Sequence, residues 1–108
     1  MPGNVRKRRP FLVVSRDAFN RDERYSKVLV VHLTSALRPR GPFDWEVEVA
    51  RATAGLPRSS VAKCNEIYTI FKADLDRLIG TLPVDVMARI DRALELVLDL
   101  RVHRAAND

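Results

Sequence analysis

The sequence has one cysteine and two histidines in 108 residues. A single thiol, Cys64, excludes an internal disulfide bond. Cys64, His32 and His103 are not spaced like the ligands of a zinc site, so we expect neither a structural metal nor a cofactor held by them. A lone cysteine in a strand-like stretch is more often a small buried residue than a nucleophile, and we expect Cys64 to be buried.

The sequence also lacks any apolar run close to the roughly 20 residues that cross a bilayer. The basic residues near the N-terminus are not followed by the apolar core of a signal sequence, so we expect a cytoplasmic protein. Lysine and arginine together number 19 against 14 aspartate and glutamate residues, a net charge of +5. This excess favours a polyanionic partner such as nucleic acid but is too small to identify one.

The length and composition indicate one folded domain over residues 1–108. Hydrophobic residues make up 46% and charged residues 31%, which is typical of a globular chain. We interpret residues 1–8, which include the run Arg6, Lys7, Arg8 that leads into Arg9, as a basic N-terminal arm, and residues 101–108 as a frayed tail.

Three segments have the composition of buried strands. They are residues 11–15 (FLVVS), 28–35 (VLVVHLTS) and 59–71 (SSVAKCNEIYTIF). A polar stretch between the first two predicts a long hairpin loop, and Gly55 with Pro57 predicts a turn before the third.

A fourth strand is predicted at FDWEVEV, residues 43–49, where apolar and acidic residues alternate. Such alternation places one set of side chains toward the core and the other in solvent. The inward set is Phe43, Trp45, Val47 and Val49, and the solvent-facing set is Asp44, Glu46 and Glu48.

Two helices are expected to follow. In KADLDRLI, residues 72–79, Leu75, Leu78 and Ile79 have helical spacing, and Gly80 stands where a helix commonly ends. The second helix begins after Pro83, with an apolar stripe of Val84, Met87, Ile90, Leu94, Val97 and Leu98 and an opposite, solvated face of Asp85, Arg92, Glu95 and Asp99. Four or five short strands followed by a helix indicate a mainly β fold, a small antiparallel barrel or sandwich covered by one helix.

Four stretches in order resemble the MazF/PemK toxin family: RRPFLVVSRDAFNR, VVHLTS, GLPRSSVAKCNEIYTI and LPVDVMARIDRALELVLDL. In that family an Arg-Pro pair opens a strand, a loop with Asn-Arg follows, and a later strand ends in Thr-Ser or similar. The match spans residues 9–100. No single motif is specific, but the ordered set is.

The resemblance implies an SH3-like small β-barrel of the MazF/CcdB/Kid type and a homodimer. It also implies a sequence-specific, metal-independent endoribonuclease that cleaves single-stranded RNA and is inhibited by a MazE-like antitoxin. Arg9 matches the family's active-site arginine and Thr34 its active-site threonine. The resemblance further implies a set of RNA-binding residues, namely Lys7, Arg8, Ser15, Arg16, Asn20, Arg21 and Ser35.

These residue types suit cleavage by attack of a ribose 2′-hydroxyl on the adjacent phosphate. The Arg9 guanidinium can meet two of the phosphate oxygens on which charge develops, and the Thr34 hydroxyl can donate one further hydrogen bond. Arginine is a poor base because its pKa is above about 12. His32 is two residues before Thr34 on one strand face, with Cα atoms about 6.5 Å apart, and is a candidate base or a residue that fills the wall.

Two alternatives to an active endoribonuclease stay open. Family members begin with a strand resembling RGDIYLVDL that has no counterpart here, which suggests either a start placed too far downstream or a degenerate, catalytically inactive remnant. A non-enzymatic toxin that grips a protein partner is the other alternative. The gyrase-directed relatives with that activity have a C-terminal Trp-Gly-Ile, whereas this chain ends in RAAND.

Overall fold

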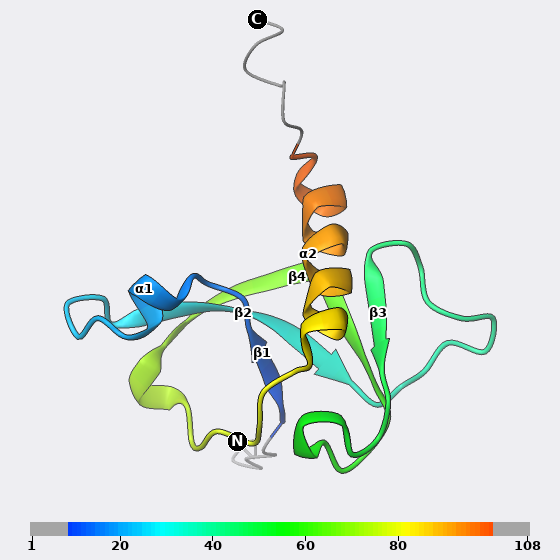
Figure 1. Cartoon of the computed structure of the whole chain (residues 1–108), viewed down its shortest axis with the longest axis horizontal. Coiled ribbons are helices and arrows are strands. Elements are labelled where there is room, and N and C mark those ends of the chain that lie inside the picture. Colours follow the sequence, from blue (N-terminus) through cyan, green and yellow to red (C-terminus); the bar gives the residue numbers. More distant parts are fainter. Residues whose placement is uncertain (1–8, 101–108) are drawn as a thin grey trace, which may run out of the picture.

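The computed structural model describes residues 9–100, so the basic arm and the tail lie outside the described residues (Figure 1). Within this part a curled antiparallel sheet is followed by a long helix. The elements are β1 (Phe11–Val13), α1 (Asp17–Asn20), β2 (Lys27–Thr34), β3 (Glu46–Val49), η2 (Thr53–Gly55), β4 (Ser60–Phe71), η3 (Lys72–Asp74) and α2 (Val84–Leu98). None of the helices described in residues 9–100 is both long enough and apolar enough to span a membrane.

The sheet has the strand order β1-β2-β4-β3, so β1 and β3 are its two edges. The predicted strands at 11–15, 28–35 and 59–71 are confirmed with small shifts at their ends. β2 pairs Val31 with Ile67 but His32 with Lys63, so three residues of β4, including Glu66, form a bulge. A bulge bends its strand and increases the twist. The sheet therefore curls into a half-barrel, which agrees with the predicted fold class.

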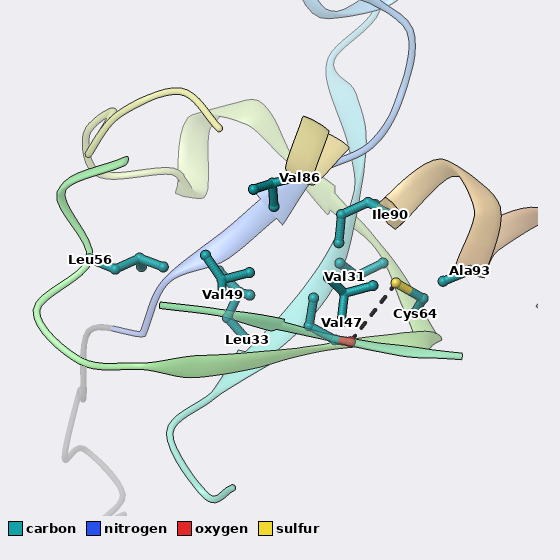
Figure 2. Packing of buried hydrophobic residues seen from close by; sticks show 10 residues of the cluster. Val31, Leu33, Val47, Val49, Leu56, Cys64, Val86, Ile90 and Ala93 are labelled. Atoms are coloured by element: carbon teal, nitrogen blue, oxygen red, sulfur yellow. Dashed lines mark hydrogen bonds between the residues drawn. The ribbon is translucent and has the colours of Figure 1, made fainter. Parts of the chain in front are cut away.

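The helix α2 packs across one face of this half-barrel (Figure 1). Its buried residues Val86, Ile90 and Ala93 recur at helical spacing. They meet the inward side chains of β2, β3 and β4, as Figure 2 shows. The predicted helix is confirmed, but the predicted stripe was wrong at its first and last residues, because Val84 and Leu98 are exposed. The buried partners of α2 on the sheet and in the turn after β3 are Val31, Leu33, Val47, Val49, Leu56, Ala62 and Cys64.

Cys64 is fully buried among these residues, as expected. Burial raises the pKa of its thiol to about 11, with a further contribution from the negative charge of Glu46. A thiol with this pKa is protonated at neutral pH and is a poor nucleophile. Cys64 is therefore part of the core.

The predicted helix over residues 72–79 was wrong. The chain makes only the 3₁₀ turn η3 and is extended at Leu75. Eight residues are too few to form a stable helix without a packed face, and Leu78 is 83% exposed. Gly80 has a different role from the predicted helix stop, because a Cβ there would come within 2.2 Å of the Ala54 carbonyl oxygen. The glycine permits two backbone segments to meet.

The predicted strand at 43–49 was wrong at its start and at one residue of its solvent-facing set. β3 begins at Glu46, whose N–H donates to the Phe43 carbonyl in a turn. Phe43 is 46% exposed, whereas Glu46 is buried. Glu46 does project opposite to Val47, but that face of the sheet is covered by the β2–β3 loop at this point. The alternation of faces was predicted correctly, but the face that carries Glu46 is covered by protein at this residue and does not meet solvent.

Candidate functional site

The face of the sheet opposite α2 contains a polar hollow, which we call the Thr34 pocket. It has a volume of about 360 Å³ and lies between the ends of β2, β3 and β4 and the β2–β3 loop. Pairing explains its composition, because His32 lies opposite Lys63 on one side and Lys63 lies opposite Glu46 on the other. The lining residues are His32, Thr34, Ala36, Leu37, Arg38, Pro39, Glu46, Val61, Lys63 and Glu66.

One wall of the Thr34 pocket is an ion pair between Arg38 and Glu46. Nε of Arg38 donates to Oε1 at 2.7 Å and Nη2 donates to Oε2 at 2.9 Å, a two-pronged geometry. The backbone N–H of Phe43 donates to the same carboxylate at 3.1 Å, and the guanidinium lies 4.0 Å from the centre of the Phe43 ring. The hydrogen bonds from Arg38 hold the pKa of the Glu46 carboxyl below its ordinary value. Arg38 therefore has a fixed position.

A second ionic group joins His32, Glu66 and Lys63 across the pocket. The bulge in β4 brings Oε1 of Glu66 to 3.7 Å from Nδ1 of His32 and Oε2 to 3.7 Å from Nζ of Lys63. The other ring nitrogen of His32, Nε2, is buried and has no hydrogen-bond partner within residues 9–100. Among those residues no cluster of three or more histidine, cysteine or acidic side chains could hold a metal ion.

Thr34 lies at the end of β2 on the pocket wall. Its Oγ1 accepts a hydrogen bond from the Ala36 N–H at 3.2 Å. A hydroxyl has one hydrogen to donate besides its acceptor lone pairs, so this contact leaves the Thr34 hydrogen available for a ligand. Ser35, the next residue, is exposed.

Arg9 lies at the entrance of β1 and is exposed. The ladder pairs Phe11 with His32. If that antiparallel register continued for two more residues, Arg9 would stand opposite Thr34 on the same face as Phe11 and His32. The fold therefore directs the predicted catalytic arginine and threonine to the same end of the β1–β2 pair. Lys7 and Arg8 lie outside the described residues.

The other predicted RNA-binding residues lie at the opposite end of β2, in the loop that contains α1 (Figure 1). Ser15 and Asn20 bond to each other, and Oγ of Ser15 also accepts from the Leu29 N–H. Leu29 is five residues from Thr34 along β2, about 17 Å. Arg16 and Arg21 are exposed on this loop. The structure does not bring this group together with Thr34.

A second hollow of about 310 Å³ lies on the same face, between the Thr34 pocket and the loop that contains α1. It is lined by Phe11, His32, Tyr68, Thr69 and Ile70, and His32 belongs to both hollows. Phe11 and Tyr68 are each at least 40% exposed. An extended ligand that left the Thr34 pocket past His32 would meet these aromatic side chains.

Four charged residues of the Thr34 pocket were absent from the predicted site: Arg38, Glu46, Lys63 and Glu66. Arg38 lies in the β2–β3 loop and Glu46, eight residues later, begins β3, and no sequence pattern predicts their pairing. Lys63 was detectable in principle, because a strand that pairs centrally with β2 places every second residue beside His32 and Thr34. Glu66 depends on the bulge, which the sequence does not predict.

Comparison with known proteins agrees with the fold. A family model for the PemK-like, MazF-like toxin of type II toxin-antitoxin systems matches residues 2–98. Endoribonuclease MazF6 of Mycobacterium tuberculosis and endoribonuclease MazF2 of Mycobacterium bovis are each 37% identical over 98 residues, which cover 87% of this chain and 81% of the relative.

Among solved structures, the Mycobacterium tuberculosis toxin MazF-mt6 superposes with a TM-score of 0.74 at 30% identity, covering 86% of this chain and 88% of that one. An endoribonuclease in complex with its cognate antitoxin from a mycobacterial species has a TM-score of 0.72 at 27% identity, over 86% and 82% of the two chains. The chain belongs to the PemK-like, MazF-like toxin family of type II toxin-antitoxin systems.

Proposed function

We propose that this chain is an endoribonuclease toxin that cleaves single-stranded RNA in the cytoplasm. The observation that carries the proposal is the polar pocket at the Thr34 end of β2 in a chain of this family, and the β1–β2 pairing supports a position of Arg9 near the same end. The curated relatives are named endoribonucleases, which supports an enzyme over the non-enzymatic alternative.

The reaction is attack of a ribose 2′-hydroxyl oxygen on the neighbouring phosphorus, with loss of the 5′-oxygen of the next nucleotide. Negative charge builds on the non-bridging oxygens as the bond forms. Arg9 contributes a two-pronged donor to those oxygens, and Thr34 contributes the hydroxyl hydrogen that its contact with Ala36 leaves available. The products are a 2′,3′-cyclic phosphate and a 5′-hydroxyl.

His32 is the candidate general base of this site. Its Nδ1 lies 3.7 Å from Oε1 of Glu66, and Nε2 is the ring nitrogen without a hydrogen-bond partner among residues 9–100. Nε2 is buried, and the ring centre of Phe11 lies 6.1 Å from that of His32. Base catalysis thus requires that the substrate gain access to Nε2, whereas a structural histidine requires no such access.

The partners follow from the family and from the exposed surface. A MazE-like antitoxin and a second copy of the chain are the proposed protein partners, since a related structure is a complex with its cognate antitoxin. Exposed apolar side chains support such contacts, among them Leu78 and Val84, which are 83% and 87% exposed. Sedimentation should report twice the 12.3 kDa chain mass at micromolar concentration.

The test is incubation of the purified protein with a mixed single-stranded RNA, with and without EDTA. We expect cleavage in both, because the proposed chemistry uses hydrogen-bond donors only. Sequencing of the ends should show cyclic phosphate on the upstream product. Loss of cleavage in EDTA with recovery in magnesium would overturn the mechanism, and intact RNA in every condition would overturn the proposed activity.

A further inference from the structure

We propose that Lys63 is a further catalytic residue, whose ammonium group donates a hydrogen bond to a non-bridging oxygen of the scissile phosphate at Thr34. This inference rests on the proposed endoribonuclease activity, which makes Thr34 a neighbour of that phosphate. It adds a cation from β4, which lies on the side of β2 opposite to β1.

Strand pairing places Lys63 on the wall of the Thr34 pocket. Lys63 is the partner of His32 in the β2–β4 ladder, and Thr34 is the partner of Val61, two residues before Lys63. Residues at such diagonal positions lie about 7–8 Å apart on one face of a sheet. The long stem of lysine can bridge this distance to a phosphate held by Thr34. Both side chains line the pocket, and that of Lys63 is 25% exposed, so a ligand can reach it.

Lys63 and Arg38, the two cations in the pocket lining, differ in the donors that they have available. Arg38 makes hydrogen bonds of 2.7 and 2.9 Å to Glu46, which fix its guanidinium against the β2–β3 loop. Nζ of Lys63 lies 3.7 Å from Oε2 of Glu66, which is beyond hydrogen-bond distance. That ion pair therefore uses none of the three N–H donors of the ammonium group.

A phosphate can displace the ion pair between Lys63 and Glu66. The Glu66 carboxylate is shared, because its Oε1 lies 3.7 Å from Nδ1 of His32 and accepts a hydrogen bond from the Tyr68 hydroxyl at 3.3 Å. Its side chain is 36% exposed, and ion pairs with such exposure contribute little to stability. A phosphate oxygen within hydrogen-bond distance of Nζ makes the stronger contact.

A cation at this position acts on the rate of the reaction more than on binding. Negative charge builds on the non-bridging oxygens as the 2′-oxygen attacks, so a donor to them is stronger in the transition state than in the bound substrate. Lys63 keeps its proton and forms no covalent bond. Since the β1–β2 pairing supports a position of Arg9 near the same end of β2, the phosphate lies between cations from two neighbouring strands.

The experiment uses a short RNA that contains one cut site mapped in the mixed-RNA assay. Single-turnover cleavage at saturating protein gives the rate, and the same RNA with a 2′-O-methyl group at the cut nucleotide gives the affinity. Lys63→Met should lower the rate by about ten- to a hundredfold, because one donor to the transition state is lost. Lys63→Arg keeps a charged donor and should retain more of the rate.

The matched control is Lys27→Met, the same substitution at the other end of β2. Lys27 is exposed and alternates in step with Val31 and Leu33, so its side chain projects from the face opposite the Thr34 pocket. The control should keep the parental rate, and Lys63→Met should lose no more affinity than the control does. Lys63→Gln is a second neutral variant, which carries the same test if thermal unfolding shows that Lys63→Met does not fold.

Sulfur substitution in the RNA tests the contact itself. The two phosphorothioate diastereomers at the cut site place sulfur, a weaker hydrogen-bond acceptor than oxygen, at one or the other non-bridging position. The ratio of their cleavage rates should change by several-fold in Lys63→Met and stay at the parental value in Lys27→Met. A lysine that only neutralises Glu66 would not affect this ratio.

Three results would overturn the assignment of Lys63 alone. The first is cleavage by Lys63→Met at the parental rate. The second is a slower rate with an unchanged diastereomer ratio, which would make Lys63 a structural neighbour of Glu66. The third is a loss of affinity without a loss of rate, which would make Lys63 a contact of the bound substrate only. A parent chain that leaves RNA intact would instead refute the proposed endoribonuclease activity, and the role of Lys63 with it.

Discussion

The two faces of the sheet are built from the same strands but have opposite chemistry. Along β2, Val31 and Leu33 enter the core under α2, while His32 and Thr34 line the Thr34 pocket. The core face is closed by apolar packing, and the pocket face holds a buried carboxylate with its arginine. Apolar side chains of similar size commonly stabilise a fold as well as a buried ion pair does. We propose that the core face maintains the fold and that the pocket face performs the chemistry.

The largest expected effect on stability is from Ile90→Ala on the core face. Ile90 is fully buried between α2 and the sheet, so its truncation leaves a cavity. Similar changes cost about 2–5 kcal/mol of unfolding free energy. Urea unfolding measures the loss. RNA cleavage at low temperature should persist in the folded fraction, and a rate loss beyond the unfolded fraction would contradict the division between the faces.

Thr34→Val, on the pocket face, should have the opposite effect to Ile90→Ala: it should lower the cleavage rate and leave the stability nearly unchanged. The two side chains have nearly the same shape, and Thr34 is only half-buried, so the unfolding free energy should change by less than about 1 kcal/mol. The single-turnover cleavage rate should fall by about ten- to a hundredfold, because a donor to the transition state is lost. An unchanged rate would remove Thr34 from the reaction.

Glu46→Gln tests the buried ion pair through pH. The pKa of Glu46 in the folded state lies below its ordinary value of 4.5, chiefly because Arg38 donates to the carboxylate. The charged pair therefore stabilises the fold above pH 4.5, and this stabilisation is lost as the pH falls through 4.5 toward the folded pKa. Thermal unfolding should show Glu46→Gln less stable near neutral pH, with the difference shrinking in acid. A constant difference across the range would contradict the pairing.

The smallest effect is expected from Lys72→Met. Lys72 directly follows β4 and belongs neither to the core under α2 nor to the Thr34 pocket. Nζ of Lys72 donates to the carbonyl oxygens of Phe19 and Asp22 at 2.8 and 2.9 Å, which ties the α1 loop to the end of β4. Its loss should speed amide hydrogen exchange in residues 16–26 by several-fold and leave α2 unchanged. Uniform acceleration would indicate global destabilisation instead of a local link.

The sequence predicts correctly those strands and helices that have a regular pattern of apolar residues along their own length. β2, β4 and α2 have long, regular patterns, and their boundaries were predicted within a few residues. The helix expected at residues 72–79 failed because three apolar residues at helical spacing have no partner to pack against. Gly80 was misinterpreted for a related reason, since its close approach to Ala54 joins segments far apart in the chain.

The candidate site was predictable only in part. The family resemblance supplied Arg9 and Thr34, and strand alternation put His32 beside Thr34. The role of Glu46 was not predictable, because an acidic residue in an alternating strand has the same pattern whether it meets water or Arg38. Glu66 reaches His32 only through the bulge in β4, and a bulge of three residues leaves no repeat in the sequence.

Single-turnover cleavage by Arg9→Lys, measured together with RNA affinity, tests most directly whether the pocket end of β1 and β2 is the reaction centre. Lysine keeps the charge but loses the two-pronged geometry. The account predicts a rate loss of about a hundredfold or more with little change in affinity, because Arg9 acts on charge that develops only in the transition state. Cleavage by Arg9→Lys at close to the parental rate would contradict it.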